Sequence, residues 1–139
     1  MNGGLAAIGD LYKTAVFELC AWLVSDAAKD CRKKLKLPFS GELIGSTIRE
    51  KLPSAELRAN QFDSDSLPDY ALLDPLLKAL IEERLSTDQL IARGHHPAHV
   101  AKIHKMLRKA EFTRYQAPPL LKVSTQSFGS GWRKPIAAS

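Results

Sequence analysis

The sequence is poor in cysteine and has no long apolar run, and each shortage excludes a class of protein. Two cysteines in 139 residues cannot form a disulfide framework, and neither Cys20 nor Cys31 lies in a CxxC or CxxH pair. No apolar run reaches the roughly 18 residues of a membrane-spanning helix. The start, MNGGLAAIGD, lacks the basic region and apolar stretch of a signal peptide. We therefore expect a cytoplasmic protein in a reducing compartment.

Acidic residues are scarce in the last third of the chain. Residues 91–139 carry nine basic side chains and one acid, Glu111, whereas residues 59–90 carry two bases and seven acids. A basic tail behind an acidic middle indicates an anionic partner, either nucleic acid or a small molecule with phosphate groups. At 45% hydrophobic residues the chain is typical of a folded protein, and its length allows one modest core.

Most of the apolar pattern has helical spacing. A first helix is expected after Asp10 as its N-cap, and a second after Asp74 as N-cap with Pro75 at the first helical position. The spacing S-x-x-Q from Ser86 predicts a capping box and a short helix that ends at Gly94. A last helix is expected from Pro97, with an apolar stripe of Val100, Ile103 and Leu107.

Few segments are candidates for strands. The first helix carries a broad apolar stripe that requires a partner surface, such as a sheet outside this chain. Residues 120–124, LLKVS, fit either a short strand or an extended strap. The chain by itself is therefore predicted to be mostly α-helical.

Three patterns point to chemistry, each beside a plain structural interpretation. Residues 86–109 have the helix, glycine turn and basic helix of a DNA-reading helix–turn–helix, but also of an ordinary helical hairpin. Four histidines lie between His95 and His104, but no cysteine or nearby carboxylate completes a metal site, so we expect none. Lys13 lies in the first turn of the first helix, where the helix terminus favours phosphate.

A long polar loop covers residues 53–69. Ser54 is able to donate to a phosphate, and Glu56, Asp63 and Asp65 have the side chains that bind Mg²⁺. The same residues serve equally well as helix caps and solvated loop acids. Loops of this length in a compact domain are usually functional or disordered.

Four blocks of the sequence together resemble a known family. They are GGLAAIGDLYKTAVFELCAWL, KLPSAELRANQFDSDSLPDYALLD, LSTDQLIARG and EFTRYQAPPLLKVSTQSFGSGWRKPIA. In this order they resemble the C-terminal part of the synthetase domain of NAD⁺ synthetases of the glutamine-dependent type, over residues 3–137. Residues 86–109 of the helix–turn–helix pattern lie within the range of this resemblance.

The resemblance implies a fold and a reaction. The synthetase domain is a Rossmann-like α/β fold of the ATP-pyrophosphatase, or adenine nucleotide α-hydrolase, type and pairs as a homodimer. The family uses Mg²⁺ and ATP to adenylate the carboxylate of nicotinic acid adenine dinucleotide (deamido-NAD). Ammonia, which a separate domain releases from glutamine, then converts the adenylate to NAD⁺. ATP and Mg²⁺ are thus expected as substrates of the complete enzyme, with no cofactor held tightly by this chain.

The resemblance also assigns roles to residues. Lys13 stands where the family has a lysine on the ATP phosphates, and Ser54 where it has a residue that touches ATP. Glu56, Arg58, Asp63 and Asp65 lie in a segment that orders over the nucleotides as a lid. The family motif E-[YF]-K-R-R-Q reads Glu111-Phe112-Thr113-Arg114-Tyr115-Gln116 here. Thr113 stands where the family has a lysine that contacts deamido-NAD, so that charged contact is lost unless Arg114 replaces it.

The family's ATP-binding S-G-G-x-D-S loop does not occur in this sequence, nor does anything that resembles a glutaminase. We therefore expect the chain to be a C-terminal fragment, such as a truncated reading frame, a gene remnant or a split subunit. We expect it to be inactive alone, because placing the ATP phosphates requires the loop. Two alternatives are a non-catalytic subunit that pairs with the missing half and a DNA-binding module at residues 86–109.

Overall fold

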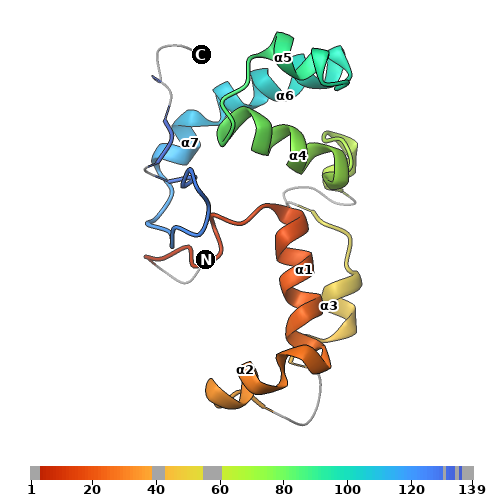
Figure 1. The fold of residues 1–139 in the computed structure, drawn as a ribbon, viewed down its shortest axis with the longest axis vertical. Helices are drawn as coiled ribbons and strands as arrows, with labels where there is room; N and C mark the ends of the chain where they lie inside the picture. The colour runs from red at the N-terminus through yellow and green to blue at the C-terminus, as the bar shows by residue number, and fades with distance from the viewer. Residues whose placement is uncertain (1–3, 39–42, 55–60, 130, 134, 136–139) are drawn as a thin grey trace. The chain divides into compact units, whose positions relative to one another are not determined.

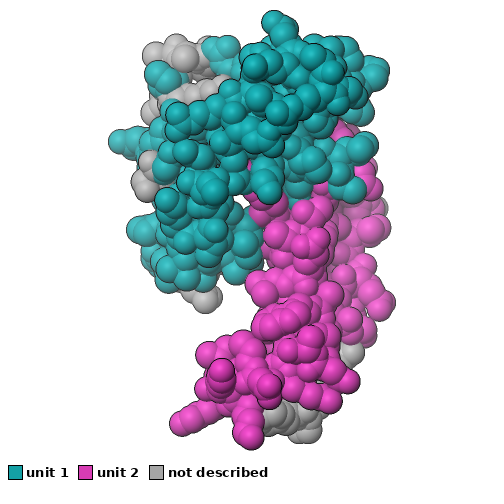
Figure 2. Space-filling model, viewed as in Figure 1, with its two compact units in different colours: residues 1–11, 71–139 teal, residues 12–70 magenta. Residues whose placement is uncertain are grey.

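Helices are the main regular elements of the described residues, as the sequence pattern predicts. The computed structural model describes residues 4–38, 43–54, 61–129, 131–133 and 135. Within those ranges no strand forms, and one parallel bridge joins Ala6 to Leu120. The chain divides into two compact units, which Figure 2 colours separately: unit 1 is Met1–Leu11 with Ala71–Ser139, and unit 2 is Tyr12–Tyr70. None of the helices in the described ranges is both long and apolar enough to cross a membrane.

Unit 2 is built around one long helix with short helical segments after it (Figure 1). Its elements are α1 (Lys13–Val24), η1 (Asp26–Ala28), α2 (Lys29–Lys34), α3 (Ser46–Glu50) and η2 (Asp63–Asp65). α1 contacts α3, yet no residue of α1 is buried. The apolar side chains of Phe17, Leu19 and Trp22 are each about two-fifths exposed. The stripe that the sequence predicts is therefore present on α1 but only partly covered within unit 2.

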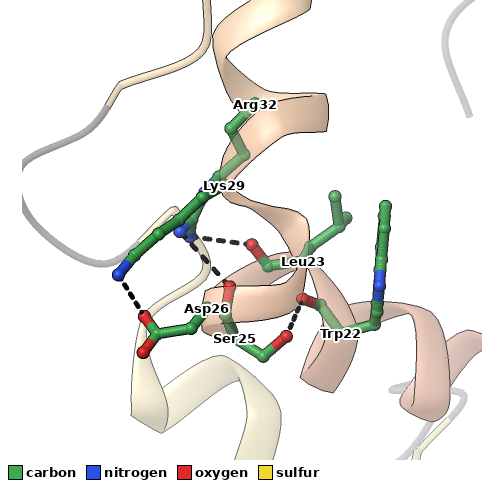
Figure 3. A network of polar contacts seen from close by, with 6 residues as sticks. All are labelled: Trp22, Leu23, Ser25, Asp26, Lys29 and Arg32. Atoms are coloured by element: carbon green, nitrogen blue, oxygen red, sulfur yellow. Dashed lines mark hydrogen bonds and ion pairs between the residues drawn. The ribbon is translucent and has the colours of Figure 1, made fainter.

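A polar corner ends α1 and turns the chain into α2 (Figure 3). The guanidinium of Arg32 donates from Nη1 to the carbonyl of Leu23 at 2.9 Å and from Nη2 to that of Ser25 at 3.3 Å. These are the carbonyls that a helix leaves without partners at its C-terminus, where a positive charge is also favoured. Lys29 pairs with Asp26 at 2.9 Å on the surface. The corner explains why the basic run after residue 28 forms a short helix.

Unit 1 contains nearly all of the described core. Its helices are α4 (Tyr70–Ile81, whose first residue ends unit 2), α5 (Thr87–Ala92), α6 (Pro97–Lys109) and α7 (Glu111–Tyr115). α6 contacts both α5 and α7. The buried apolar side chains come from α4, α5 and α6: Leu73, Leu76, Ala79, Leu80, Ile81, Leu90, Val100, Ile103 and Leu107. The stripe predicted for the last helix is therefore confirmed.

The turns between these helices also follow the sequence. Ser86 N donates to Gln89 Oε1 at 2.8 Å, and Gln89 N donates to Ser86 Oγ at 3.2 Å, which completes the predicted capping box. Gly94 has a φ of 96°, in the left-handed region that glycine enters without steric cost, and it ends α5 as expected. Pro97 occupies the first turn of α6.

The predicted start of α4 is wrong. Asp74 is not an N-cap: it is a buried residue inside α4, which begins one turn earlier at Tyr70 and includes Pro75. Pro75 is unable to donate the backbone hydrogen bond expected at its position. Starting at Tyr70 places Leu73 on the same buried face as Leu76 and Leu80. The apolar burial gained by Leu73 offsets the missing hydrogen bond.

The predicted cap of the first helix is also wrong. α1 begins at Lys13, with Tyr12 at its N-cap position. Asp10 instead belongs to unit 1, where it is 6% exposed and binds the segment that follows α7, called the tail from here on. Its carboxylate accepts hydrogen bonds from the backbone N–H groups of Val123 (2.7 Å), Ser124 (2.7 Å) and Phe128 (2.6 Å). Ser124 Oγ adds another at 2.8 Å. Several charge-assisted bonds outweigh the single bond of a helix cap.

Candidate functional site

Lys13 is the first residue of α1, in the first turn as the sequence predicts. Its ammonium lies 5.9 Å from the ring centroids of both Phe17 and Tyr70. Those two rings meet edge to face with their centroids 6.5 Å apart. The N-terminus of an α-helix carries a partial positive charge, and Lys13 adds its ammonium in the first turn. A lysine held over aromatic faces at a helix start is suited to an anion.

Ser54 lies at the base of the long polar loop. Its hydroxyl donates to the carbonyl of Gln61, and Asp63 N donates to the carbonyl of Pro53 at 3.0 Å. These two bonds join the segment before residue 55 to the segment after residue 60, and both segments belong to unit 2. The lid residues Glu56 and Arg58 lie outside the described residues. The structure therefore defines the base of the predicted lid.

Tyr70 links the loop to Lys13 and was missed by the sequence reasoning. Its hydroxyl donates to Asp63 Oδ2, while its ring lies against the Lys13 ammonium. Asp65 Oδ2 accepts from Phe62 N at 2.9 Å and so caps the short turn of η2. The signal in the sequence was weak, because a tyrosine after Pro68-Asp69 is also an ordinary helix start. Both aspartates of the predicted lid thus have internal partners.

Arg114 is the one buried basic residue among those that the structure describes. It is 7% exposed, and its Nη1 pairs with Glu111 Oε2 at 2.6 Å. Nη2 donates to the carbonyl of Phe128 at 2.7 Å and to that of Trp132. The guanidinium carbon lies 4.5 Å from the Phe128 ring centroid and 4.3 Å from that of Trp132. Burial lowers the pKa of Arg114, and the nearby Glu111 opposes that change.

Nη2 of Arg114 and the contacts with the Phe128 and Trp132 rings hold α7 to the tail. Nη1 is bound within α7 by Glu111. Thr113, the neighbour of Arg114, is exposed on α7. Gly131 completes the turn, because a Cβ at this position would lie 2.7 Å from Ser127 N. Gly131 and Arg114, both in the last sequence block, are therefore required by packing within unit 1.

The histidines do not assemble a metal site. His96 Nδ1 accepts from Ala98 N at 3.3 Å, and its ring lies 5.3 Å from that of His99. In the ranges that the structure covers, no group of three or more histidine, cysteine, aspartate or glutamate side chains is placed to hold a metal ion. Cys20 and Cys31 are both free thiols.

Comparison with known proteins identifies the family. The family model for NAD synthase matches residues 1–117. The chain belongs to the NAD synthase family. Among curated proteins, the glutamine-dependent NAD(+) synthetase of Synechocystis is 45% identical over 99% of this chain, and that of Rhodobacter capsulatus is 41% identical over 98%. The chain spans only 22% and 24% of those two relatives, respectively.

A solved structure agrees with the sequence relatives. The glutamine-dependent NAD⁺ synthetase of Acinetobacter baumannii, in complex with ADP, has a TM-score of 0.50 and 27% identity, and it covers 92% of this chain. The chain covers 19% of that protein. These matches confirm the family resemblance and give no support to the DNA-binding or non-catalytic alternatives. Residues 86–109 form the plain helical hairpin of α5 and α6.

Proposed function

We propose that this chain supplies the C-terminal part of the synthetase domain of a glutamine-dependent NAD⁺ synthetase. The observation that carries the proposal is the 45% identity over 99% of the chain with a relative of which it spans 22%. The complete protein would adenylate the carboxylate of deamido-NAD with ATP, release pyrophosphate, and form NAD⁺ by attack of ammonia. We place it in the cytoplasm, which suits the two free thiols.

Within this reaction Lys13 would contact the ATP phosphates. The position of Lys13 as the first residue of α1 supports the role, because a helix N-terminus and a lysine beside it both favour phosphate. Ser54 would add a hydroxyl from the base of the lid. Glu56, Arg58, Asp63 and Asp65 would close over the nucleotides and keep water from an adenylate that hydrolysis would waste.

Thr113 and Arg114 would serve deamido-NAD. Thr113 offers an exposed hydroxyl on α7, and Arg114 would act chiefly by holding α7 against the tail through Glu111 and the Phe128 carbonyl. Mg²⁺ would accompany the ATP phosphates and neutralise their charge. Asp63 and Asp65 accept hydrogen bonds from Tyr70 and from Phe62 N, respectively, so the described residues do not fit a separate Mg²⁺ site.

The remainder of the domain would cover α1. We propose the Rossmann-like sheet of the ATP-pyrophosphatase type as the missing part, together with the homodimer of the family. Phe17, Leu19 and Trp22 provide apolar area on α1 that unit 2 leaves partly exposed. Burying such side chains is the main favourable term in the packing of helices on sheets.

A chimera tests this function directly. The chain replaces the matching segment of the Synechocystis relative, and NAD⁺ formation is measured with ATP, Mg²⁺, deamido-NAD and ammonia. We expect turnover by the chimera and none by the isolated chain. Lys13→Ala should lower kcat/KM for ATP by about ten- to a hundredfold, the loss of one charge-assisted contact.

The matched control is Lys29→Ala, which removes an exposed lysine of the same unit and should leave kcat/KM unchanged. An inactive but folded chimera would contradict the proposed function. Robust turnover by the isolated chain would contradict its dependence on the rest of the protein. Thr113→Lys should lower KM for deamido-NAD by about tenfold, and an unchanged KM would remove Thr113 from the substrate contacts.

A further inference from the structure

A cavity of about 280 Å³ lies in unit 1, where the end of α7 meets the tail. Its polar lining includes Arg114, Ser127 and Arg133, and its apolar lining includes Pro118, Pro119 and Leu120. This volume is close to the lower end for small-molecule sites, roughly 300 Å³. The cavity is therefore large enough for a small organic molecule with one polar end.

The charges around the cavity favour an anion. Glu111 is the single acid in residues 91–139, and it already pairs with Arg114 at 2.6 Å. Arg133 is exposed and has no ion-pair partner within the described part of the chain. Its guanidinium carbon lies 4.7 Å from the ring centroid of Tyr115, which supports the side chain near the cavity. The positive charge of Arg133 also contributes to the lowered pKa of Arg114.

A second observation concerns Arg114 itself. The side chain is 5% exposed, and its Nε is buried without a hydrogen-bond partner among the described residues. Buried donors of this kind are rare, because each loses its water and gains nothing in return. The Arg114 guanidinium therefore contributes positive potential to the cavity that it lines, rather than a further accessible hydrogen-bond donor.

We propose that this cavity binds the phosphate group of a small organic phosphate, such as a sugar phosphate. Arg133 is the accessible cation, Arg114 is the buried one, and the wall from Pro118 to Leu120 packs against the organic part. A phosphate monoester carries nearly two negative charges at neutral pH, which suits a region with eight more bases than acids better than a carboxylate does. The lining residues all belong to this chain, and the accessible cation, Arg133, has no part in the proposed NAD⁺ synthetase reaction.

Calorimetric titration of the full 139-residue chain at fixed ionic strength tests the proposal. The probes are ribose 5-phosphate, inorganic phosphate and benzoate, with neither ATP nor deamido-NAD present. We expect ribose 5-phosphate to bind more tightly than the other two. Arg133→Gln should weaken its binding by about tenfold, because one charge-assisted contact is lost. Arg133 is exposed, so the variant should unfold at the same temperature as the parent chain.

The matched control is Arg108→Gln, which removes the same charge from an exposed position on α6 outside the cavity. It should change the affinity by no more than about twofold, the size of a screened long-range effect. Equal weakening by both variants would overturn the proposal, since it would reflect general attraction to the basic tail. No binding of ribose 5-phosphate at millimolar concentration would also overturn it, as would equally tight binding of benzoate or inorganic phosphate.

Discussion

The two units of this chain bury their residues very differently. Unit 1 contains every described buried apolar residue except Ala28, and also the buried polar residues Asp10, Asp74, Glu111, Arg114 and Ser127. In unit 2 the twelve-residue helix α1 has no buried residue, and Ile48 and Leu52 are more than three-fifths exposed. A helix that keeps its apolar stripe without burying it depends on a surface beyond its own unit.

The contrast also separates two kinds of polar interaction. In unit 1 the ion pair of Glu111 and Arg114 is buried, and Arg114 also donates to the carbonyl of Phe128, 14 residues away. The carboxylate of Asp10 likewise accepts from Phe128 N, 118 residues away. In unit 2 the pair of Lys29 and Asp26 lies on the surface three residues apart, where it contributes little. Polar groups therefore hold unit 1 together, whereas in unit 2 they mainly finish helix ends. Substitutions in matched pairs test this difference.

The largest effect is expected from Arg114→Met. The substitution leaves Glu111 buried without its partner and removes the donors to two tail carbonyls. Breaking a buried ion pair from one side typically costs about 3–5 kcal/mol of unfolding free energy. Urea unfolding followed by circular dichroism measures the loss, and Arg108→Met on the exposed face of α6 serves as the control. A loss below that of the control would show that the pair does not stabilise unit 1.

The next prediction compares one leucine from each unit. Leu90→Ala removes a fully buried side chain of α5 and should lower the unfolding free energy by about 2–5 kcal/mol. Leu19→Ala removes a side chain of α1 that is 37% exposed, so in the isolated chain it should cost about 1 kcal/mol or less. Equal losses from the two variants in urea unfolding would abolish the difference between the units.

Asp10→Asn should destabilise unit 1 by about 1.5–3 kcal/mol at neutral pH, because charge-assisted hydrogen bonds become neutral ones. Asp26→Asn is the control, since Asp26 is an exposed aspartate of unit 2 paired with Lys29. We expect little change from the control in the same thermal and urea measurements. A neutral Asp10→Asn would mean that the carboxylate charge is unnecessary for holding the tail.

The pH dependence of Asp10 follows from the same contacts. Its pKa is lowered: burial raises it, but hydrogen bonds from the backbone of Phe128, Ser124 and Val123 outweigh that effect. The stability that the carboxylate contributes is therefore complete above its pKa in the unfolded chain, 3.8. It is lost as the pH falls through the lower pKa of the folded chain. Unfolding free energies measured from neutral to acidic pH should fall less steeply in Asp10→Asn than in the parent, and parallel curves would contradict this.

The smallest effect is expected at the capping box. Ser86→Ala removes the hydroxyl that accepts from Gln89 N and should cost about 1 kcal/mol. The neighbouring Thr87→Ala leaves both capping bonds intact and provides the comparison. If Ser86→Ala left the thermal midpoint unchanged relative to Thr87→Ala, local capping would contribute nothing measurable to unit 1.

By itself, the sequence determined the features that depend on near neighbours. The capping box at Ser86, the glycine turn at Gly94, the helix start at Pro97 and the stripe of Val100, Ile103 and Leu107 all arise within a few residues. The four ordered sequence blocks were likewise sufficient to predict the family, which the comparisons confirm. These features are local or additive along the chain, so no tertiary contact is needed to find them.

The tertiary structure alone decided which polar residues are shared between distant segments. Asp10 reads as a helix cap in sequence, yet it binds N–H groups more than 110 residues away. Arg114 binds Glu111 and the Phe128 carbonyl through its Nη atoms, and Tyr70 joins Asp63 to Lys13, neither of which the sequence pattern predicts. A carboxylate or guanidinium that is buried on folding requires partners that satisfy its charge and its hydrogen bonds. Those partners are fixed only when the chain folds, which is why the sequence left these choices open.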